Sequence, residues 1–176
     1  MIRFFIAFLV LLATLFTLEL TPWAQAHLVV PWTNLLAQAS TALVTMFDPN
    51  VIAEGKVIRS ASNGFAVSIE AGCNGVEATI VLLAAMLAFP ASWRYRFMGL
   101  AIGFVAVQAL NVVRIISLFY IGQWSYTVFE WAHLYVWQAL IMLDVLVVWL
   151  LWVRRVPRSG EGSGPPPSGP PALAHG

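Results

Sequence analysis

Three side chains that are suited to acyl-transfer chemistry stand far apart in the chain, at Cys73, Arg114 and His133. A cysteine thiolate is a nucleophile that forms covalent acyl intermediates. A guanidinium stabilises a developing oxyanion or holds a substrate carboxylate. An imidazole takes a proton from a thiol and returns it to a leaving amine near neutral pH. These residue types predict a cysteine-dependent acyl-transfer site, provided that the fold brings them together.

The expected nucleophile lies in the segment Gly72-Cys73-Asn74-Gly75, directly before a long apolar run. We expect this segment to begin a helix, where unpaired backbone N–H groups and the positive end of the helix dipole favour a thiolate. The pKa of Cys73 is therefore expected to be lowered. The alternative is a small buried side chain that fills a gap in the packing.

The second candidate, Arg114, follows Asn111 by one helical turn inside an apolar segment. A charge in such surroundings costs a few kcal/mol on insertion scales, so it is rarely without a role. We expect an anion site, or an ion pair with Glu77 one turn inward from Cys73 on the same helical face, and the two are not exclusive. We count Asn74, Glu77 and Asn111 as supporting residues. For His133, the alternative is a polar residue of the membrane interface.

The composition shows which kind of protein must carry these residues. Of 176 residues, 60% are apolar and 10% are charged, and the mean hydropathy is +0.83. Soluble domains are roughly 45–50% apolar and about 25% charged, so this is a membrane protein. A net charge of +1 leaves no polycationic face for nucleic acid. A single cysteine excludes an internal disulfide and a cysteine cluster for zinc.

The hydropathy pattern predicts an all-α integral membrane protein with four transmembrane helices. The expected spans cover about residues 2–20, 74–90, 97–120 and 133–153, so residues 1–153 form one multi-pass membrane catalytic domain. The first span fits a retained anchor best. Its flanking Arg3 and the tripeptide Ala24-Gln25-Ala26 also fit a cleavable signal peptide.

The loop of residues 21–72 is expected to carry two small elements. Apolar residues at spacings of three and four predict an amphipathic helix over 32–47 that lies along the membrane surface. Residues 51–59 and 65–70 are typical of two strands joined through Asn63-Gly64, which gives a β-hairpin. Residues 154–176 are rich in proline, glycine and serine and predict a disordered cytoplasmic tail.

Arginines at the ends of the spans predict the orientation. Arg3, the pair Arg94 and Arg96, and the pair Arg154 and Arg155 belong on the cytoplasmic side by the positive-inside rule. Both termini are then cytoplasmic, and loops 21–72 and 121–132 face outward. Lys56 and Arg59 in the outer loop run against this rule, but they are few and are accompanied by acidic residues.

Counting along the helices places the candidate residues at one depth. At a rise of 1.5 Å per residue, Cys73 and Arg114 lie roughly 25 Å, and His133 roughly 30 Å, from the cytoplasmic boundary of a core about 30 Å thick. The three side chains should therefore meet at the outer face. Gln108 and Asp144 fall near the middle of the membrane, where we expect a hydrogen bond between them.

The segments AGCNGVEAT and NVVRI and the segment around His133 resemble the exosortase/archaeosortase family of multi-pass membrane cysteine transpeptidases, over about residues 50–153. The resemblance implies that Cys73 is the nucleophile and that Arg114 and His133 are the second and third catalytic residues. Many members have more spans, so the chain is similar to a short exosortase such as exosortase H, whose partners carry an IPTL-type tail.

By this resemblance, the substrates are exported proteins with a short C-terminal motif, a transmembrane helix and a basic end. They are cut on the outer side of the bacterial inner membrane. Residues and resemblance together predict a membrane-embedded cysteine endopeptidase or transpeptidase that needs no metal or organic cofactor. One rival is a membrane scaffold in which Arg114 and Glu77 tie helices together. Another is a small transporter with a polar path through Asp144 and Gln108.

Overall fold

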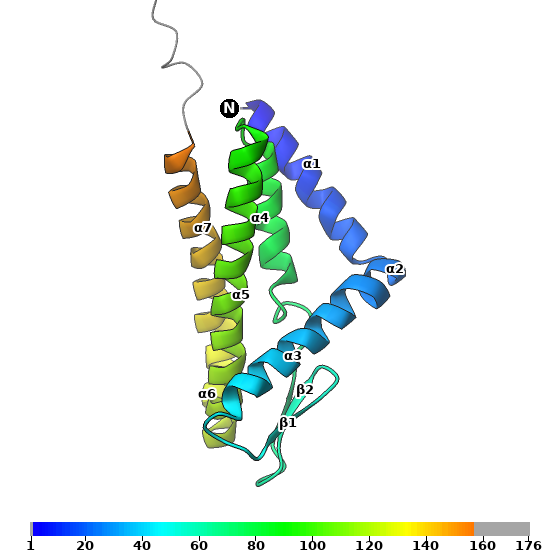
Figure 1. Cartoon of the computed structure of the whole chain (residues 1–176), viewed down its shortest axis with the longest axis vertical. Helices are drawn as coiled ribbons and strands as arrows, with labels where there is room; N and C mark the ends of the chain where they lie inside the picture. The colour runs from blue at the N-terminus through cyan, green and yellow to red at the C-terminus, as the bar shows by residue number, and fades with distance from the viewer. Residues whose placement is uncertain (1, 157–176) are drawn as a thin grey trace, which may run out of the picture.

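The computed structural model describes residues 2–156, which form a mostly helical membrane protein with a small sheet at one end (Figure 1). Its helices are α1 (Ile2–Glu19), α2 (Pro22–Ala24), α3 (Val30–Val44), α4 (Val76–Ala88), α5 (Trp93–Trp124), α6 (Tyr126–Trp131) and α7 (Trp137–Arg155). Two π-helical turns, η1 (Gln25–Val29) and η2 (Ala132–Val136), connect α2 to α3 and α6 to α7. Arg154 and Arg155 of the expected tail end α7 and Val156 follows it, whereas residues 157–176 of that tail lie outside the described residues.

Three helical stretches of the described chain are long and apolar enough to cross a membrane: Ile2–Glu19, Trp93–Trp124 and Tyr126–Arg155. The helix α4 has 13 residues and is about 20 Å long, which is shorter than a hydrocarbon core of about 30 Å. The helical membrane architecture is confirmed, whereas four full-length spans are not.

The ends of α4 explain its short length. Gly75 caps its start with a left-handed φ of 71°, which favours glycine. Phe89 is extended at its end, because the residue before a proline, here Pro90, avoids the helical region. The expected span 74–90 therefore loses residues at both ends.

The bundle core lies where α4, α5 and α7 meet, around the buried side chains of Leu82, Met86, Val107, Val145 and Trp152. Glycines of α5 make this packing close. A Cβ on residue 99 would lie 2.2 Å from the Trp152 indole nitrogen, and one on residue 103 would lie 2.6 Å from Leu82. Small residues let membrane helices approach closely, so these two positions set the spacing of the three helices.

The sheet has three antiparallel strands instead of the expected hairpin: β1 (Val51–Glu54), β2 (Val57–Ser60) and β3 (Ala66–Ser68). The expected single strand 51–59 is broken at Gly55 and Lys56, and Glu54 pairs with Val57 across this two-residue turn. Gly55 has a φ of 59°, which such turns require. The predicted turn at Asn63-Gly64 is present between β2 and β3.

The helix α3 packs on α5 and on strands of the sheet. Its buried residues are Thr33, Leu36, Ala37, Ser40, Thr41 and Val44. Of the expected apolar face, Leu36 is buried, whereas Leu35, Leu43 and Met46 are 53%, 47% and 74% exposed. Small side chains on the inner face allow close packing, and several large apolar ones are left facing outward.

The helix α5 connects the bundle to the sheet. Its 32 residues rise about 48 Å, so its C-terminal part continues past a hydrocarbon core of about 30 Å. There the Phe119 ring packs 6.0 Å from that of Phe65, and Asn63 donates a 2.7 Å hydrogen bond to Gln123. The sheet is therefore held against the helix that carries Arg114.

Candidate active site

The loop between β3 and α4 carries Cys73 in a tightly bent backbone. Gly72 and Gly75 have φ values of 80° and 71°, in the left-handed region that favours glycine. A Cβ on residue 75 would also lie 2.8 Å from the Gln108 side chain. The Cys73 N–H donates a 2.9 Å hydrogen bond to the Glu70 carbonyl. The glycines therefore make the loop compact enough for its thiol to face α5 and η2.

The structure brings the three predicted side chains together. The Cys73 Sγ lies 2.8 Å from the His133 Nε2, and an Arg114 Nη2 lies 3.4 Å from the same sulfur. Arg114 is 2% exposed, and the other two are half-buried. A thiol beside an imidazole and a buried guanidinium is the arrangement needed for proton transfer and oxyanion stabilisation. The catalytic roles of the three residues stay predictions.

Glu77 and Arg114 act on the loop from two sides, and they do not form the ion pair considered above. The Glu77 carboxylate accepts a 2.6 Å hydrogen bond from the Gly72 N–H, and the Arg114 Nη1 donates a 3.0 Å bond to the Gly72 carbonyl. Within residues 2–156 the ion pairs join Lys56 to Glu70 and Arg59 to Glu54. Gly72 is thus held through both of its peptide groups.

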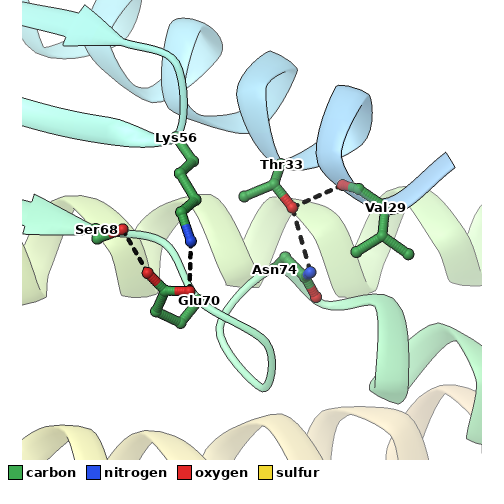
Figure 2. A network of polar contacts seen from close by, with 6 residues as sticks. All are labelled: Val29, Thr33, Lys56, Ser68, Glu70 and Asn74. Atoms are coloured by element: carbon green, nitrogen blue, oxygen red, sulfur yellow. Dashed lines mark hydrogen bonds and ion pairs between the residues drawn. The ribbon is translucent and has the colours of Figure 1, made fainter. Parts of the chain in front are cut away.

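Asn74 ties the other side of the loop to α3 (Figure 2). Its amide nitrogen donates a 3.2 Å hydrogen bond to the Thr33 hydroxyl, which itself donates to the Val29 carbonyl at 2.8 Å. The Asn74 side-chain oxygen accepts from the Val76 N–H at 3.0 Å, and its carbonyl accepts from the Trp32 indole at 3.2 Å. Asn74, the residue next to Cys73, is therefore anchored to α3 and closes the turn that leads into α4.

Glu70 anchors the start of the loop to the sheet. Its carboxylate accepts hydrogen bonds from the Lys56 ammonium and the Ser68 hydroxyl, as Figure 2 shows. Hydrogen bonds from Lys56 and Ser68 hold the pKa of Glu70 below its usual value. The segment around Cys73 is thus fixed to the sheet, to α3 and to α5.

Burial raises the pKa of the Cys73 thiol, and the nearby Arg114 cation opposes this effect only in part. The expectation of a lowered pKa is therefore wrong. The first N–H group of α4, that of Val76, is taken by the Asn74 side chain. No hydrogen bond of the described residues joins a backbone N–H to the sulfur. The resting thiol is consequently neutral at physiological pH, and it needs a base to become a nucleophile.

His133 belongs to the π-helical turn η2 (Ala132–Val136). Single π turns inside helices are frequent at functional sites because the extra residue changes the direction of the side chains around it. The His133 ring stacks on Phe129 with 5.7 Å between centroids and 18° between planes. This stacking orients the ring so that Nε2 faces the sulfur.

A cavity of about 290 Å³ opens beside the three side chains. It is lined by Ala71, Gly72, Cys73, Arg114, His133, Leu134 and Gln138. Sequence reasoning missed Gln138. Gln138 could have been recognised because it is a polar residue within the last apolar span, where burial of a polar side chain in lipid is unfavourable.

The other polar residues of the bundle are arranged differently from the prediction. Asn111 is completely buried, and its side chain has no hydrogen-bond partner among residues 2–156. Gln108 donates to the Gly75 carbonyl and to Thr79 of α4. Its expected hydrogen bond to Asp144 is not formed, because Gln108 faces α4 whereas Asp144 belongs to α7.

The fold and the site define a class of protein, namely a multi-pass helical membrane protein that holds a thiol, an imidazole and a guanidinium in contact at one end of its bundle. The family model for the transmembrane exosortases matches residues 2–151, so the chain belongs to the transmembrane exosortase family. No curated protein and no solved structure matches the chain. Exosortases are in general membrane proteases or transpeptidases, and membership indicates a function in protein sorting.

Proposed function

We propose that this protein is a membrane-embedded cysteine endopeptidase or transpeptidase that cleaves the C-terminal sorting tails of exported proteins. The observation that carries the proposal is the contact of the Cys73 Sγ with the His133 Nε2 at 2.8 Å and with the Arg114 guanidinium at 3.4 Å. Family membership supports the same class of reaction. Cys73, Arg114 and His133 are the catalytic residues in this proposal.

In the first step, the His133 Nε2 accepts the thiol proton while Sγ attacks the scissile carbonyl carbon. A C–S bond forms, and the carbonyl electron pair moves to the oxygen. The tetrahedral intermediate collapses when the C–N bond breaks and the His133 imidazolium gives its proton to the leaving amine. The product is a thioester between the substrate and Cys73. An amine or a water molecule then attacks this acyl-enzyme and regenerates the thiol.

Arg114 stabilises the oxyanion of both tetrahedral intermediates. Its Nη2 already lies 3.4 Å from the sulfur, so an oxygen on the attacked carbon falls within hydrogen-bonding distance. Its Nη1 bond to the Gly72 carbonyl keeps the guanidinium in place before the reaction. A preorganised charge in a site with little water stabilises a transition state more strongly than the same charge in bulk solvent.

In this proposal the enzyme spans the bacterial inner membrane with its active site on the outer side and both termini in the cytoplasm. Arg3, Arg94 and Arg154 belong to the helix ends opposite the sheet (Figure 1), which supports this orientation. The substrate is an exported protein that ends in a short motif of IPTL type, a transmembrane helix and a basic segment. The chemistry requires no metal or organic cofactor.

The first prediction tests the nucleophile. Cys73→Ala removes the atom that forms the acyl-enzyme, so we expect processing to fall to background while the protein remains in the membrane. The assay co-expresses the chain with a reporter, an exported domain followed by such a tail, and maps the new C-terminus by mass spectrometry. Ser40→Ala, at a buried position of α3, serves as the control and should process normally. Cleavage at the normal rate by Cys73→Ala would contradict the proposal.

A further inference from the structure

A second cavity lies between α1, α4 and α7. It has a volume of about 250 Å³. It is lined by Phe4, Phe5 and Phe8 of α1, Val81 and Ala85 of α4, and Met142, Val145, Leu146 and Trp149 of α7. Apart from the indole N–H of Trp149, these side chains are apolar, so this cavity differs in character from the one beside Cys73.

Helical register joins the two cavities into one groove. Along α4, Val81 and Ala85 follow Glu77 in steps of four, and the Glu77 carboxylate accepts a hydrogen bond from Gly72, which lines the cavity beside Cys73. Along α7, Met142 and Leu146 follow Gln138 in steps of four. Residues four apart lie on the same face of a helix. The α4–α7 groove, as we name this strip, therefore runs from the catalytic cavity toward the cytoplasmic end of the bundle.

The length and opening of the α4–α7 groove suit a helix better than a compact ligand. The residues from Leu134 to Trp149 rise about 22 Å, which is most of a hydrocarbon core of about 30 Å. The inner end is closed where the rings of Phe4 and Trp149 lie 6.2 Å apart. Toward the sheet, α1 diverges from the other helices (Figure 1). Met142 and Leu146 are each 49% exposed, so the groove opens sideways into the membrane.

We propose that the α4–α7 groove receives the apolar transmembrane helix of the polypeptide that Cys73 cleaves. This inference rests on the proposed function and specifies where its substrate binds. A helix in the groove leaves it at the catalytic cavity, so the chain just outside its first turn lies against the sulfur. Gln138, Met142 and Leu146 lie on one face of α7, so this face leads from the cavity beside Cys73 to the apolar cavity.

Gln138 supplies the polar contact that such a guest helix needs. The first N–H groups of any helix lack intrahelical partners, and in an apolar medium they require an acceptor. Gln138 lines the outer end of the groove, and no hydrogen bond of the described residues involves its side chain. Its amide oxygen is therefore free to accept from the start of the guest helix. A lipid acyl chain has no donor to offer this group.

Photocrosslinking tests the occupant directly. The full chain carrying Cys73→Ala is co-expressed with the reporter described above, and a photoreactive residue is placed by Leu146→p-benzoylphenylalanine. The matched control is Leu151→p-benzoylphenylalanine, because Leu151 is also a leucine of α7 and is 50% exposed but lies outside the groove lining. We expect a covalent adduct with the apolar helix of the reporter from Leu146 and only background from Leu151. Adducts with lipid alone, with a second copy of the chain, or equally from both positions would overturn the inference.

A larger side chain in the α4–α7 groove tests the groove assignment independently of the proposed function. Overpacking by Leu146→Trp should reduce reporter processing about tenfold, and Leu151→Trp should leave it nearly unchanged. Alkylation of Cys73 by iodoacetamide should proceed at the unaltered rate in both variants, because the catalytic cavity is intact. Normal processing by Leu146→Trp would overturn the groove assignment and leave the nucleophile assignment standing. If Cys73→Ala processes normally, the proposed function fails, yet a crosslink from Leu146 still supports the groove.

Discussion

The thiol of Cys73 shows how burial and neighbouring charge compete at a single atom. Removal from water disfavours the thiolate and raises the pKa, whereas the Arg114 cation favours the thiolate and lowers it. Burial has the larger effect, so the pKa is raised overall. In the proposed mechanism, the 2.8 Å contact with the His133 Nε2 lets the thiol proton move to the ring as the nucleophile forms.

The second prediction follows from the sign of these two effects. Alkylation of Cys73 by iodoacetamide should increase with pH through a midpoint above that of a free cysteine, since only the thiolate reacts. Arg114→Gln removes the cation that opposes burial, so the midpoint should move to still higher pH and the rate at neutral pH should fall roughly tenfold. The measurement is the alkylated fraction by mass spectrometry across a pH series.

Arg94→Gln is the control for this experiment, because Arg94 is an exposed arginine at the start of α5. Its alkylation profile should match that of the unmodified chain. If Arg114→Gln alkylates faster at neutral pH than the unmodified chain, then the guanidinium does not stabilise the thiolate as described.

At the scale of elements, α3 holds in place the loop that carries Cys73. Its Thr33 hydroxyl accepts from the Asn74 amide, and Asn74 is 1% exposed. Its Trp32 indole holds the Asn74 carbonyl. A buried amide without a partner costs about 1–3 kcal/mol. The position of Cys73 therefore depends on a helix that lies some forty residues earlier in the chain.

The third prediction compares two threonines of this helix. Thr33→Val removes the acceptor of the buried Asn74 amide, so the free energy of unfolding should fall by about 1–3 kcal/mol, and reporter processing should slow as well. Thr41→Val is a matched control, because Thr41 is also buried on α3 and its hydroxyl has no partner among residues 2–156. Thermal unfolding in detergent provides the measurement. Equal stabilities of the two variants would show that the Thr33 contact does not support the loop.

At the scale of the whole molecule, the lengths of the helices are the basis of the proposed position of the site at the outer surface of the membrane. From Trp93 to Arg114, α5 rises about 31 Å, close to the full thickness of a hydrocarbon core. The remaining turns of α5 then stand outside this core together with the sheet. In the proposed function, the cavity beside Cys73 is thus at the level where a substrate helix in the α4–α7 groove meets the aqueous part of its own chain.

The fourth prediction tests this orientation. In the Cys73→Ala background, Ala61→Cys should react with a membrane-impermeant maleimide in cells whose outer membrane is permeable. Ser92→Cys should react only after the inner membrane is opened, because residue 92 lies at the arginine-rich end of the bundle. Both positions are exposed, so access to the reagent is limited by the membrane alone. Labelling of Ser92→Cys in intact cells would reverse the proposed topology.

The sequence by itself determined that this is a membrane protein. It also indicated Cys73, Arg114 and His133 as the candidate catalytic residues and predicted that they lie at a common depth. Depth was predictable because the helical rise per residue is a local property of the backbone. An apolar composition likewise requires a membrane whatever the packing. These inferences needed no knowledge of which helix faces which.

Only the tertiary structure decided how each side chain is turned about its helix axis. Glu77 binds the Gly72 backbone instead of Arg114, Gln108 faces α4 instead of Asp144, and α3 buries its small residues. The desolvation that raises the pKa of Cys73 is also a result of packing. The rotation of a helix about its axis depends on which side chains pack against its neighbours. These neighbours come from distant segments of the chain, so the rotation cannot be predicted from any one segment alone.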